Sequence, residues 1–169
     1  SKKIKKNEIF FAIKGKKIDG NKFTSEALKK KSSLVVVNRL QKGYPSFKQV
    51  KVKNTLNFLT DCSSIFRENI DAKIISITGS CGKTTLKEMI GLTLQKISKT
   101  TYSEKSFNNK YGVPLSLFNL KQNDEFGVLE VGMDKKGEID YLTKITKPDL
   151  GVITNISYAH SKNFENISQ

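Results

Sequence analysis

One stretch decides the fold of this 169-residue chain: Ile74-Ile75-Ser76-Ile77-Thr78-Gly79-Ser80-Cys81-Gly82-Lys83-Thr84-Thr85-Leu86-Lys87-Glu88. Its isoleucine-rich start is typical of a strand buried on both faces of a parallel sheet. From Lys83 onward, apolar residues recur at a spacing of three or four, which predicts a helix that packs one stripe against the sheet: Leu86, Met89, Ile90, Leu94 and Ile97. Strand, glycine loop and helix in this order indicate an α/β protein.

The loop between the strand and the helix has the composition of a phosphate-binding loop. Gly79 and Gly82 allow a tight turn that gathers backbone N–H groups at the positive end of the helix dipole. Lys83 adds a charge for the outer phosphates of a nucleotide, and the Thr84 hydroxyl is placed for Mg²⁺. The general rule requires a glycine where Ile77 stands, so the match is to a shorter Gly-x-x-Gly-Lys-Thr loop. An ordinary turn is the alternative, but a first-turn lysine opposes the helix dipole.

The net charge of +14 is concentrated in the first third of the chain. Residues 1–53 hold 16 Lys and Arg against 3 Asp and Glu, a net of +13, whereas residues 54–169 hold 14 against 13, a net of +1. Only Arg39 and Arg67 are arginines. Because base readout and bidentate phosphate contacts favour arginine, the lysine excess argues against a specific nucleic-acid partner and suits an anionic small substrate.

The sequence also lacks the signals of membrane or secreted proteins. No apolar run approaches the roughly 18 residues of a membrane span, and no signal peptide is recognisable. Cys62 and Cys81 suggest neither a disulfide framework nor a metal cluster. We therefore expect a cytoplasmic protein with no membrane span.

Turn residues and hydrophobic periodicity predict further elements on both sides of the central stretch. Before it, we expect strands at 8–13, 34–37 and an edge strand at 48–52, with helices at 24–30, capped by Thr24, and at 54–70, capped by Asn54. After it, we expect strands at 100–103, 126–131 and 150–156, the last two buried, and helices at 114–120 and 137–145. We place a domain boundary near residue 71, and we expect an uncovered apolar region or open sheet edge near the last strand.

Two polar residues follow the predicted strands and could contribute chemistry. Glu130 ends the strand at 126–131, and ligands of open α/β sheets bind beyond the carboxyl ends of the strands, so Glu130 is a candidate magnesium ligand. The alternative is a surface glutamate at a strand end. His160 is the only histidine and follows the strand at 150–156. A lone histidine is more often a surface residue than a ligand.

Several motifs together resemble the Mur ligase family, the ATP-dependent amide-bond-forming enzymes of cell-wall precursor synthesis. The resemblance runs nearly end to end, beginning just inside the family's Asp-Ser-Arg motif at Ser1-Lys2. The segments that carry it are Phe10 to Phe23, the loop from Thr78 to Thr85, Leu86 to Met89, Phe107 to Leu115, Glu130 to Met133 with Gly137 to Ile139, and Thr154 to Ile156 with Ala159-His160. Lys2 stands where the family usually has Arg, which puts a bidentate substrate contact in doubt.

The resemblance implies an α/β fold made of two domains. Residues 1–71 would form a small amino-terminal domain that binds the uridine nucleotide of the substrate. Residues 72–169 would form part of a P-loop-type, ATP-binding central domain with a mainly parallel sheet. The implied enzyme is a cytoplasmic monomer when full length, and we expect this 169-residue chain alone to be inactive.

The implied activity is ligation of D-alanyl-D-alanine to UDP-N-acetylmuramoyl-tripeptide through an acyl phosphate, with ATP and Mg²⁺. One alternative is the family branch that adds the third amino acid, which the stretch from Asn108 to Pro114 disfavours. Two others are a non-catalytic nucleotide-binding or regulatory module and a basic nucleic-acid-binding ATPase. The implied nucleotide-binding residues are Thr78, Gly79, Ser80, Cys81, Gly82, Lys83, Thr84, Thr85 and Asn155. The implied catalytic residues are Lys83 and His160; the metal ligands are Thr84, Glu130 and His160; and the substrate-binding residues are Ser1, Lys2, Asn108 and Asn109.

Overall fold

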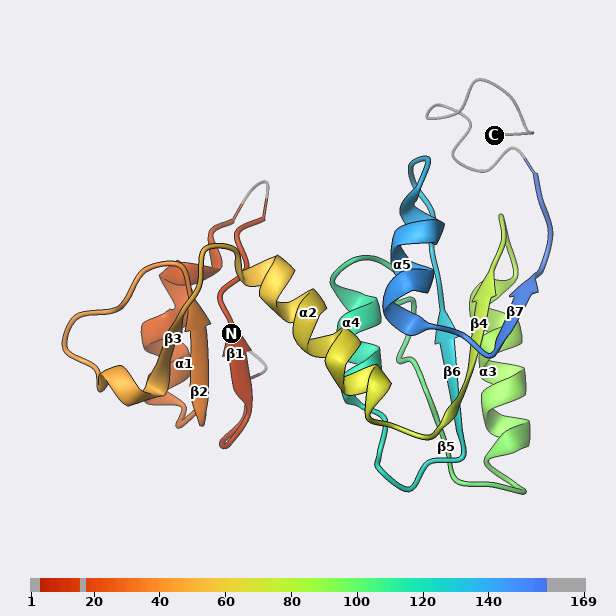
Figure 1. Ribbon diagram of the computed structural model, residues 1–169, viewed down its shortest axis with the longest axis horizontal. Helices are drawn as coiled ribbons and strands as arrows, with labels where there is room; N and C mark the ends of the chain where they lie inside the picture. Colours follow the sequence, from red (N-terminus) through yellow and green to blue (C-terminus); the bar gives the residue numbers. More distant parts are fainter. Residues whose placement is uncertain (1–3, 16–17, 158–169) are drawn as a thin grey trace. The chain divides into compact units, whose positions relative to one another are not determined.

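A computed structural model describes residues 4–15 and 18–157 of the chain (Figure 1). The chain divides into two compact units, Ser1–Asp61 and Cys62–Gln169, and the division falls within helix α2, Thr55–Glu68. The side-chain oxygen of Asn54 accepts hydrogen bonds from the backbone of Leu56 and Asn57, which confirms Asn54 as the cap of this helix. The functional division into a substrate-binding domain at 1–71 and an ATP-binding domain at 72–169 stays a prediction.

The first unit contains a three-stranded parallel sheet in the order β1-β2-β3. Its elements are β1 Ile9–Phe11, η1 Gly20–Phe23, α1 Thr24–Lys29, β2 Leu34–Val37, η2 Ser46–Lys48 and β3 Gln49–Lys51. Small and β-branched side chains form its core, namely Ala12, Ala27, Val35 and Val37. The three strands lie where the sequence predicts them, and β3 is an edge strand as expected.

The predicted cap of helix α1 is wrong. Thr24 lies inside the helix, is fully buried, and its hydroxyl has no hydrogen-bond partner. The cap residue of the preceding turn η1 is Asp19, whose carboxylate accepts a hydrogen bond from the backbone of Asn21 at 2.9 Å. The chain thus enters the helical conformation earlier than predicted, because η1 precedes α1 without a break.

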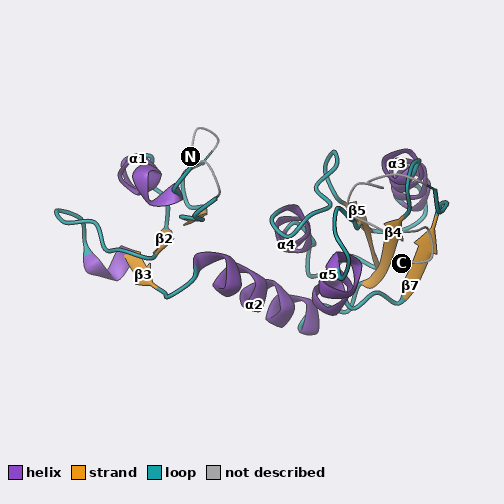
Figure 2. Ribbon diagram, turned by 90° about the horizontal axis from the view of Figure 1, so that it is seen from above, coloured by secondary structure: helices purple, strands orange, loops and turns teal. Residues whose placement is uncertain are grey.

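The second unit contains a four-stranded parallel sheet in the order β5-β6-β4-β7. The strands are β4 Lys73–Thr78, β5 Thr100–Tyr102, β6 Phe126–Glu130 and β7 Leu150–Ile153, and the helices are α3 Lys83–Leu94, α4 Gly112–Phe118 and α5 Glu138–Thr146. Helix α3 covers one face of the sheet, and α4 and α5 cover the other (Figure 2). The predicted α/β fold with parallel sheets is therefore confirmed, and all four strands end at the same edge.

Two predictions about burial in this unit are wrong. The predicted apolar stripe of α3 is wrong at Met89, which is 61% exposed, and at Ile97, which is 79% exposed and lies beyond the end of the helix. Leu86, Ile90 and Leu94 are partly buried as predicted, and the buried positions of the helix are Lys87 and Gly91. A side chain at Gly91 would collide with the Tyr102 ring, which packs against the helix there. Strand β7 was predicted to be buried, but Leu150 and Ile153 are exposed, since β7 lies at the edge of the described sheet. Among residues 4–15 and 18–157, no strand pairs with the outer edge of β7.

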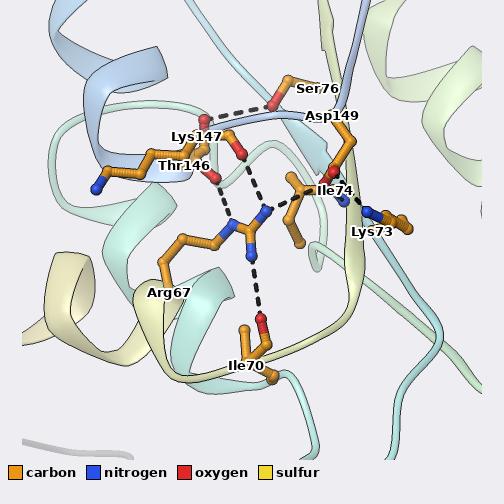
Figure 3. Close-up of polar contacts among 8 residues, drawn as sticks. All are labelled: Arg67, Ile70, Lys73, Ile74, Ser76, Thr146, Lys147 and Asp149. Atoms are coloured by element: carbon orange, nitrogen blue, oxygen red, sulfur yellow. Dashed lines mark hydrogen bonds and ion pairs between the residues drawn. The ribbon is translucent and has the colours of Figure 1, made fainter.

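A polar cluster joins the end of α2 to the end of α5 (Figure 3). The guanidinium of Arg67 donates to the carbonyls of Thr146 at 2.8 Å, Lys147 at 3.0 Å and Ile70 at 3.1 Å. Carbonyls at a helix carboxyl terminus lack intrahelical partners, so the planar donor fork of one arginine satisfies groups that would otherwise need water.

Asp149 extends this cluster to the sheet. Its carboxylate accepts the backbone N–H of Ile74 at 2.8 Å, while its own N–H donates to the carbonyl of Ile74 at 2.9 Å. The carboxylate also pairs with Lys73 and Arg67. The hydrogen bond from Ile74, assisted by these cations, holds the pKa of Asp149 below its ordinary value of 3.8. These contacts fix the start of β7 against the start of β4.

Replacing Asp149 tests this anchor. In urea unfolding at about pH 7, Asp149→Ala should lower the free energy of unfolding by about 1–3 kcal/mol, because the Ile74 N–H loses its acceptor. The folded-state pKa lies below the unfolded one, so the stabilisation is present above pH 3.8 and is lost as the pH falls through the folded pKa.

Asp149→Asn is the matched control, since it keeps an acceptor but not the charge. It should lower the free energy of unfolding less than Asp149→Ala does. Its stability should also lack the pH-dependent contribution that the ionised carboxylate makes in the wild type. An Asp149→Ala deficit that does not shrink as the pH falls through the folded-state pKa of Asp149 would contradict an anchor based on the ionised carboxylate.

Candidate functional site

The loop between β4 and α3 has a backbone that only glycine accommodates. Gly79 and Gly82 adopt positive φ angles of 133° and 78°. A side chain at Gly79 would place its Cβ 2.1 Å from the hydroxyl oxygen of Thr154, so the loop and the segment after β7 approach too closely for any other residue. A Cβ at Gly82 would meet nothing within 4 Å, which leaves the start of α3 open on that side.

The segment after β7 holds this loop in place. Asn155 accepts the N–H of Cys81 with its side-chain oxygen and the N–H of Ser80 with its carbonyl, both at 3.0 Å. Thr154 donates its hydroxyl to the carbonyl of Cys81 at 2.6 Å. The structure thus brings Asn155 to the loop, where it fixes the loop backbone. The N–H groups of the first turn of α3 lack intrahelical acceptors and so can bind an anion.

Lys83 and Thr84 begin α3 and lie at the mouth of the loop. The Lys83 ammonium donates to the carbonyl of Gly79 at 2.6 Å, so its charge lies over the loop. The Thr84 hydroxyl donates to Glu130 Oε2 at 2.8 Å. Thr85 follows in the same helical turn and is exposed, while Thr78 ends β4. Lys83 therefore contacts the loop and Thr84 contacts the end of β6, while phosphate binding by these residues stays a prediction.

Glu130 ends β6 and is only 1% exposed, so it is not the surface glutamate of the alternative interpretation. Its two carboxylate oxygens accept from Thr84 and from the side-chain amide of Asn108, the latter at 2.7 Å. Its N–H donates to the hydroxyl of Ser103 at 3.2 Å. A buried carboxylate needs such partners, and these hold it beside the first turn of α3.

The donor set at this point suits magnesium. Mg²⁺ is commonly held by one or two protein oxygens together with nucleotide phosphates and waters, and Thr84 and Glu130 offer a hydroxyl and a carboxylate 2.8 Å apart. Among residues 4–15 and 18–157, no group of three or more His, Cys, Asp and Glu side chains could hold a metal without such a ligand. The predicted site residues His160, Ser1 and Lys2 lie outside the described residues.

The two predicted substrate-binding asparagines differ in their contacts. Asn108 contacts Glu130, as described above. The side-chain oxygen of Asn109 accepts the N–H groups of Tyr111 at 3.0 Å and Gly112 at 3.1 Å, so it satisfies backbone donors where helix α4 begins. Their binding of substrate stays a prediction.

Sequence reasoning missed three residues of this region. Ser103 and Thr154 contact the site through hydroxyls. Thr154 lies in a segment that carries the family resemblance, but no local pattern marks the role of either hydroxyl. Lys87 is fully buried one helical turn after Lys83. It lies outside the predicted apolar stripe of α3, so hydrophobic periodicity did not reveal its burial.

Comparison with known proteins identifies relatives of this arrangement. Residues 77–169, more than half of the chain, match the family model of the Mur ligase middle domain. Within the described ranges, no helix has the length and apolar character needed to cross a bilayer.

Relatives of high similarity cover nearly the whole chain. The UDP-N-acetylmuramoyl-tripeptide–D-alanyl-D-alanine ligase of Buchnera aphidicola is 40% identical over 167 residues, which cover 99% of this chain and 36% of that protein. A crystal structure of MurF from Acinetobacter baumannii superposes with a TM-score of 0.89 at 32% identity over 99% of this chain and 37% of that one. MurF from Thermotoga maritima in complex with ADP gives a TM-score of 0.85 at 29% identity, over 99% of this chain and 39% of that one.

The sequence resemblance and the structural comparison agree, although the chain spans only about a third of the length of these relatives. The match to the middle domain covers the phosphate loop, Glu130 and Asn155, the elements whose convergence defines the site. The chain belongs to the Mur ligase family.

Proposed function

We propose that this chain is the substrate- and nucleotide-binding part of a ligase that joins D-alanyl-D-alanine to UDP-N-acetylmuramoyl-tripeptide. The observation that carries the proposal is the convergence of the short phosphate loop with Thr84, Glu130 and Asn108, in a chain that is 40% identical to an enzyme named for that reaction. ATP would phosphorylate the terminal carboxylate of the tripeptide, and the amine of the dipeptide would displace phosphate to form the amide bond.

Lys83 is the proposed catalytic residue for the phosphoryl step. Phosphoryl transfer depends mainly on positioning and on neutralising negative charge. With a nucleotide present, the Lys83 ammonium would exchange the carbonyl of Gly79 for the outer phosphate oxygens, while the first-turn N–H groups of α3 bind the same phosphates. The ADP complex of the Thermotoga maritima relative supports a nucleotide ligand.

Thr84 and Glu130 would hold Mg²⁺, which when bound neutralises charge on the phosphate oxygens. Asn108 donates to one oxygen of Glu130 and so leaves the other directed at Thr84. Asn155 contributes indirectly, by fixing the loop through Ser80 and Cys81. His160 remains a proposed further ligand.

The first unit would bind the uridine nucleotide at the carboxyl edge of its parallel sheet, where ligands of such sheets bind. Asn38 follows β2 and donates its side-chain amide to the carbonyl of Lys53 at 2.7 Å, while Asn21 contacts both Asn38 and Asp19. The hydrogen bonds from Asn21 lower the pKa of Asp19. This amide cluster offers donors and acceptors for a base or a phosphate, and the net charge of +13 in residues 1–53 would attract the anionic substrate.

The acceptor amine provides the direct test of the reaction. A full-length protein carrying this chain should form product from ATP, UDP-N-acetylmuramoyl-tripeptide and D-alanyl-D-alanine. With UDP-N-acetylmuramoyl-dipeptide and either diaminopimelate or lysine, it should form none. The opposite preference would assign the chain to the branch that adds the third amino acid, and nucleotide binding without any ligation would indicate a non-catalytic module. The 169-residue chain alone should give no product.

Lys83→Ala in the full-length protein should reduce kcat on the order of 10²–10³-fold, because a charge at the transferring phosphate is lost. Circular dichroism should show an unchanged fold. Lys96→Ala is the matched control, since Lys96 is an exposed lysine just beyond the other end of the same helix. A folded Lys83→Ala protein with wild-type turnover would refute the phosphate-loop assignment.

A further inference from the structure

Lys87 is a buried charge that the proposed function does not use. Its side chain is 0% exposed, in the middle of α3. The ammonium donates to the carbonyls of Ser103 and Lys105, each at 2.6 Å, and pairs with Glu88 Oε1 at 2.9 Å. The Tyr102 ring lies 5.8 Å from the same nitrogen. An ammonium has three N–H donors, and these three oxygens can take all of them.

This geometry makes Lys87 different from Lys83. A lysine that binds phosphate keeps its donors available at the nucleotide, whereas the donors of Lys87 are committed to the protein interior. Burying a charge is costly unless hydrogen bonds compensate for it, so an apolar side chain would be the simpler choice at this buried position of α3. The contacts of Lys87 therefore point to a task at the turn that it binds.

The turn that follows β5 depends on contacts from outside the turn for its stability. Lys105 adopts φ 49°, a left-handed backbone conformation that disfavours residues other than glycine. Its carbonyl is one of the two that Lys87 binds. Ser103, which supplies the other, donates its N–H to Val128 at 2.9 Å and so continues the pairing of β5 with β6. Lys87 thus holds a strained turn against the sheet.

This turn and the residues that follow it, up to Asn108, carry two groups that contact Glu130. The hydroxyl of Ser103 accepts the N–H of Glu130, and the amide of Asn108 donates to Glu130 Oε1. The carbonyl of Asn108 accepts the N–H of Gly132 at 2.7 Å, and a Cβ at Gly132 would lie 2.8 Å from Asn108 Cγ. The segment from Ser103 to Asn108 therefore contacts both the backbone and the side chain of Glu130, the last residue of β6, and also the backbone of Gly132.

We propose that Lys87 is a positioning residue for the magnesium site: its buried ammonium fixes the turn from Ser103 to Lys105, which sets Asn108 against Glu130. The inference rests on the proposed function, in which Thr84 and Glu130 hold Mg²⁺. Lys87 itself touches neither the metal nor the nucleotide. Its removal should therefore change how well magnesium supports nucleotide binding, and should leave the first turn of α3 in place.

Lys87→Met keeps the length of the side chain and removes the charge and its hydrogen bonds. In a full-length protein, calorimetry should measure the affinity for ADP over a range of Mg²⁺ concentrations. The variant should need at least about tenfold more Mg²⁺ than the wild type to reach the same ADP affinity, a loss that is typical when a partner of a metal ligand is removed. ADP binding without Mg²⁺ should be nearly unchanged. Hydrogen exchange at the Gly132 amide, which reports on Asn108, should accelerate.

Two variants separate positioning from simple instability. Leu142→Ala removes a buried side chain of α5 on the other face of the sheet, so it should destabilise the unit without moving the Mg²⁺ requirement. Glu88→Gln loses the ion pair but keeps both carbonyl contacts of Lys87, and it should resemble the wild type. If Lys87→Met does not fold, Lys87→Gln, which retains amide donors, should give a smaller shift in the same direction.

A double-mutant cycle with Asn108→Ala tests the route of action. If Lys87 acts through Asn108, the double variant should need no more Mg²⁺ than Asn108→Ala alone. Additive effects, or an unchanged Mg²⁺ requirement in folded Lys87 variants, would overturn the inference and leave the proposed function intact. A wild-type protein whose ADP affinity does not respond to Mg²⁺ would overturn the metal site itself and this role of Lys87 with it.

Discussion

The parallel pairing of β4 with β6 on one side and β7 on the other is the constraint on which the second unit depends. Parallel strands direct their carboxyl ends to one edge, so this pairing alone brings the phosphate loop, Glu130 and Asn155 together although they are far apart in the chain. The amino-terminal ends are fixed by Asp149, which exchanges hydrogen bonds with Ile74. A stable framework at one edge of the sheet thus supports a polar site at the other.

That polar site is built from buried groups whose cost is offset by hydrogen bonds. Glu130 carries a carboxylate that is 1% exposed, and Lys87 carries an ammonium that is fully buried in the same corner of the unit. Each is bonded to backbone or side-chain partners of the segment from Ser103 to Asn108. Networks of this kind rigidify a site when every member is satisfied, because a member without a partner is expensive in a low-dielectric interior.

Local patterns in the sequence predict the bounds of strands, the start of helix α3 and the direction of the central strands. The run from Leu34 to Val37 is bounded by polar residues and forms a strand with those bounds, and the short loop predicts both the helix start and the parallel sheet. Glu130 is identified because strand polarity, once known, determines which residues reach the ligand edge.

The remaining features depend on tertiary contacts that periodicity does not encode. Lys87 reads as a solvated residue until the carbonyls of the neighbouring turn are known. The exposure of Met89 and Ile153 depends on which elements lie beside α3 and β7, and the role of Asn155 depends on its approach to Cys81.

The central claim, that the strand ends form one magnesium-nucleotide site, is tested most directly by a crystal structure of a full-length protein with Mg²⁺ and a non-hydrolysable ATP analogue. The account predicts outer phosphates bound by Lys83 and the first turn of α3, with Mg²⁺ about 2.0–2.1 Å from the Thr84 hydroxyl and held by Glu130. A triphosphate bound away from the loop, or a Mg²⁺ coordinated by neither residue, would contradict it.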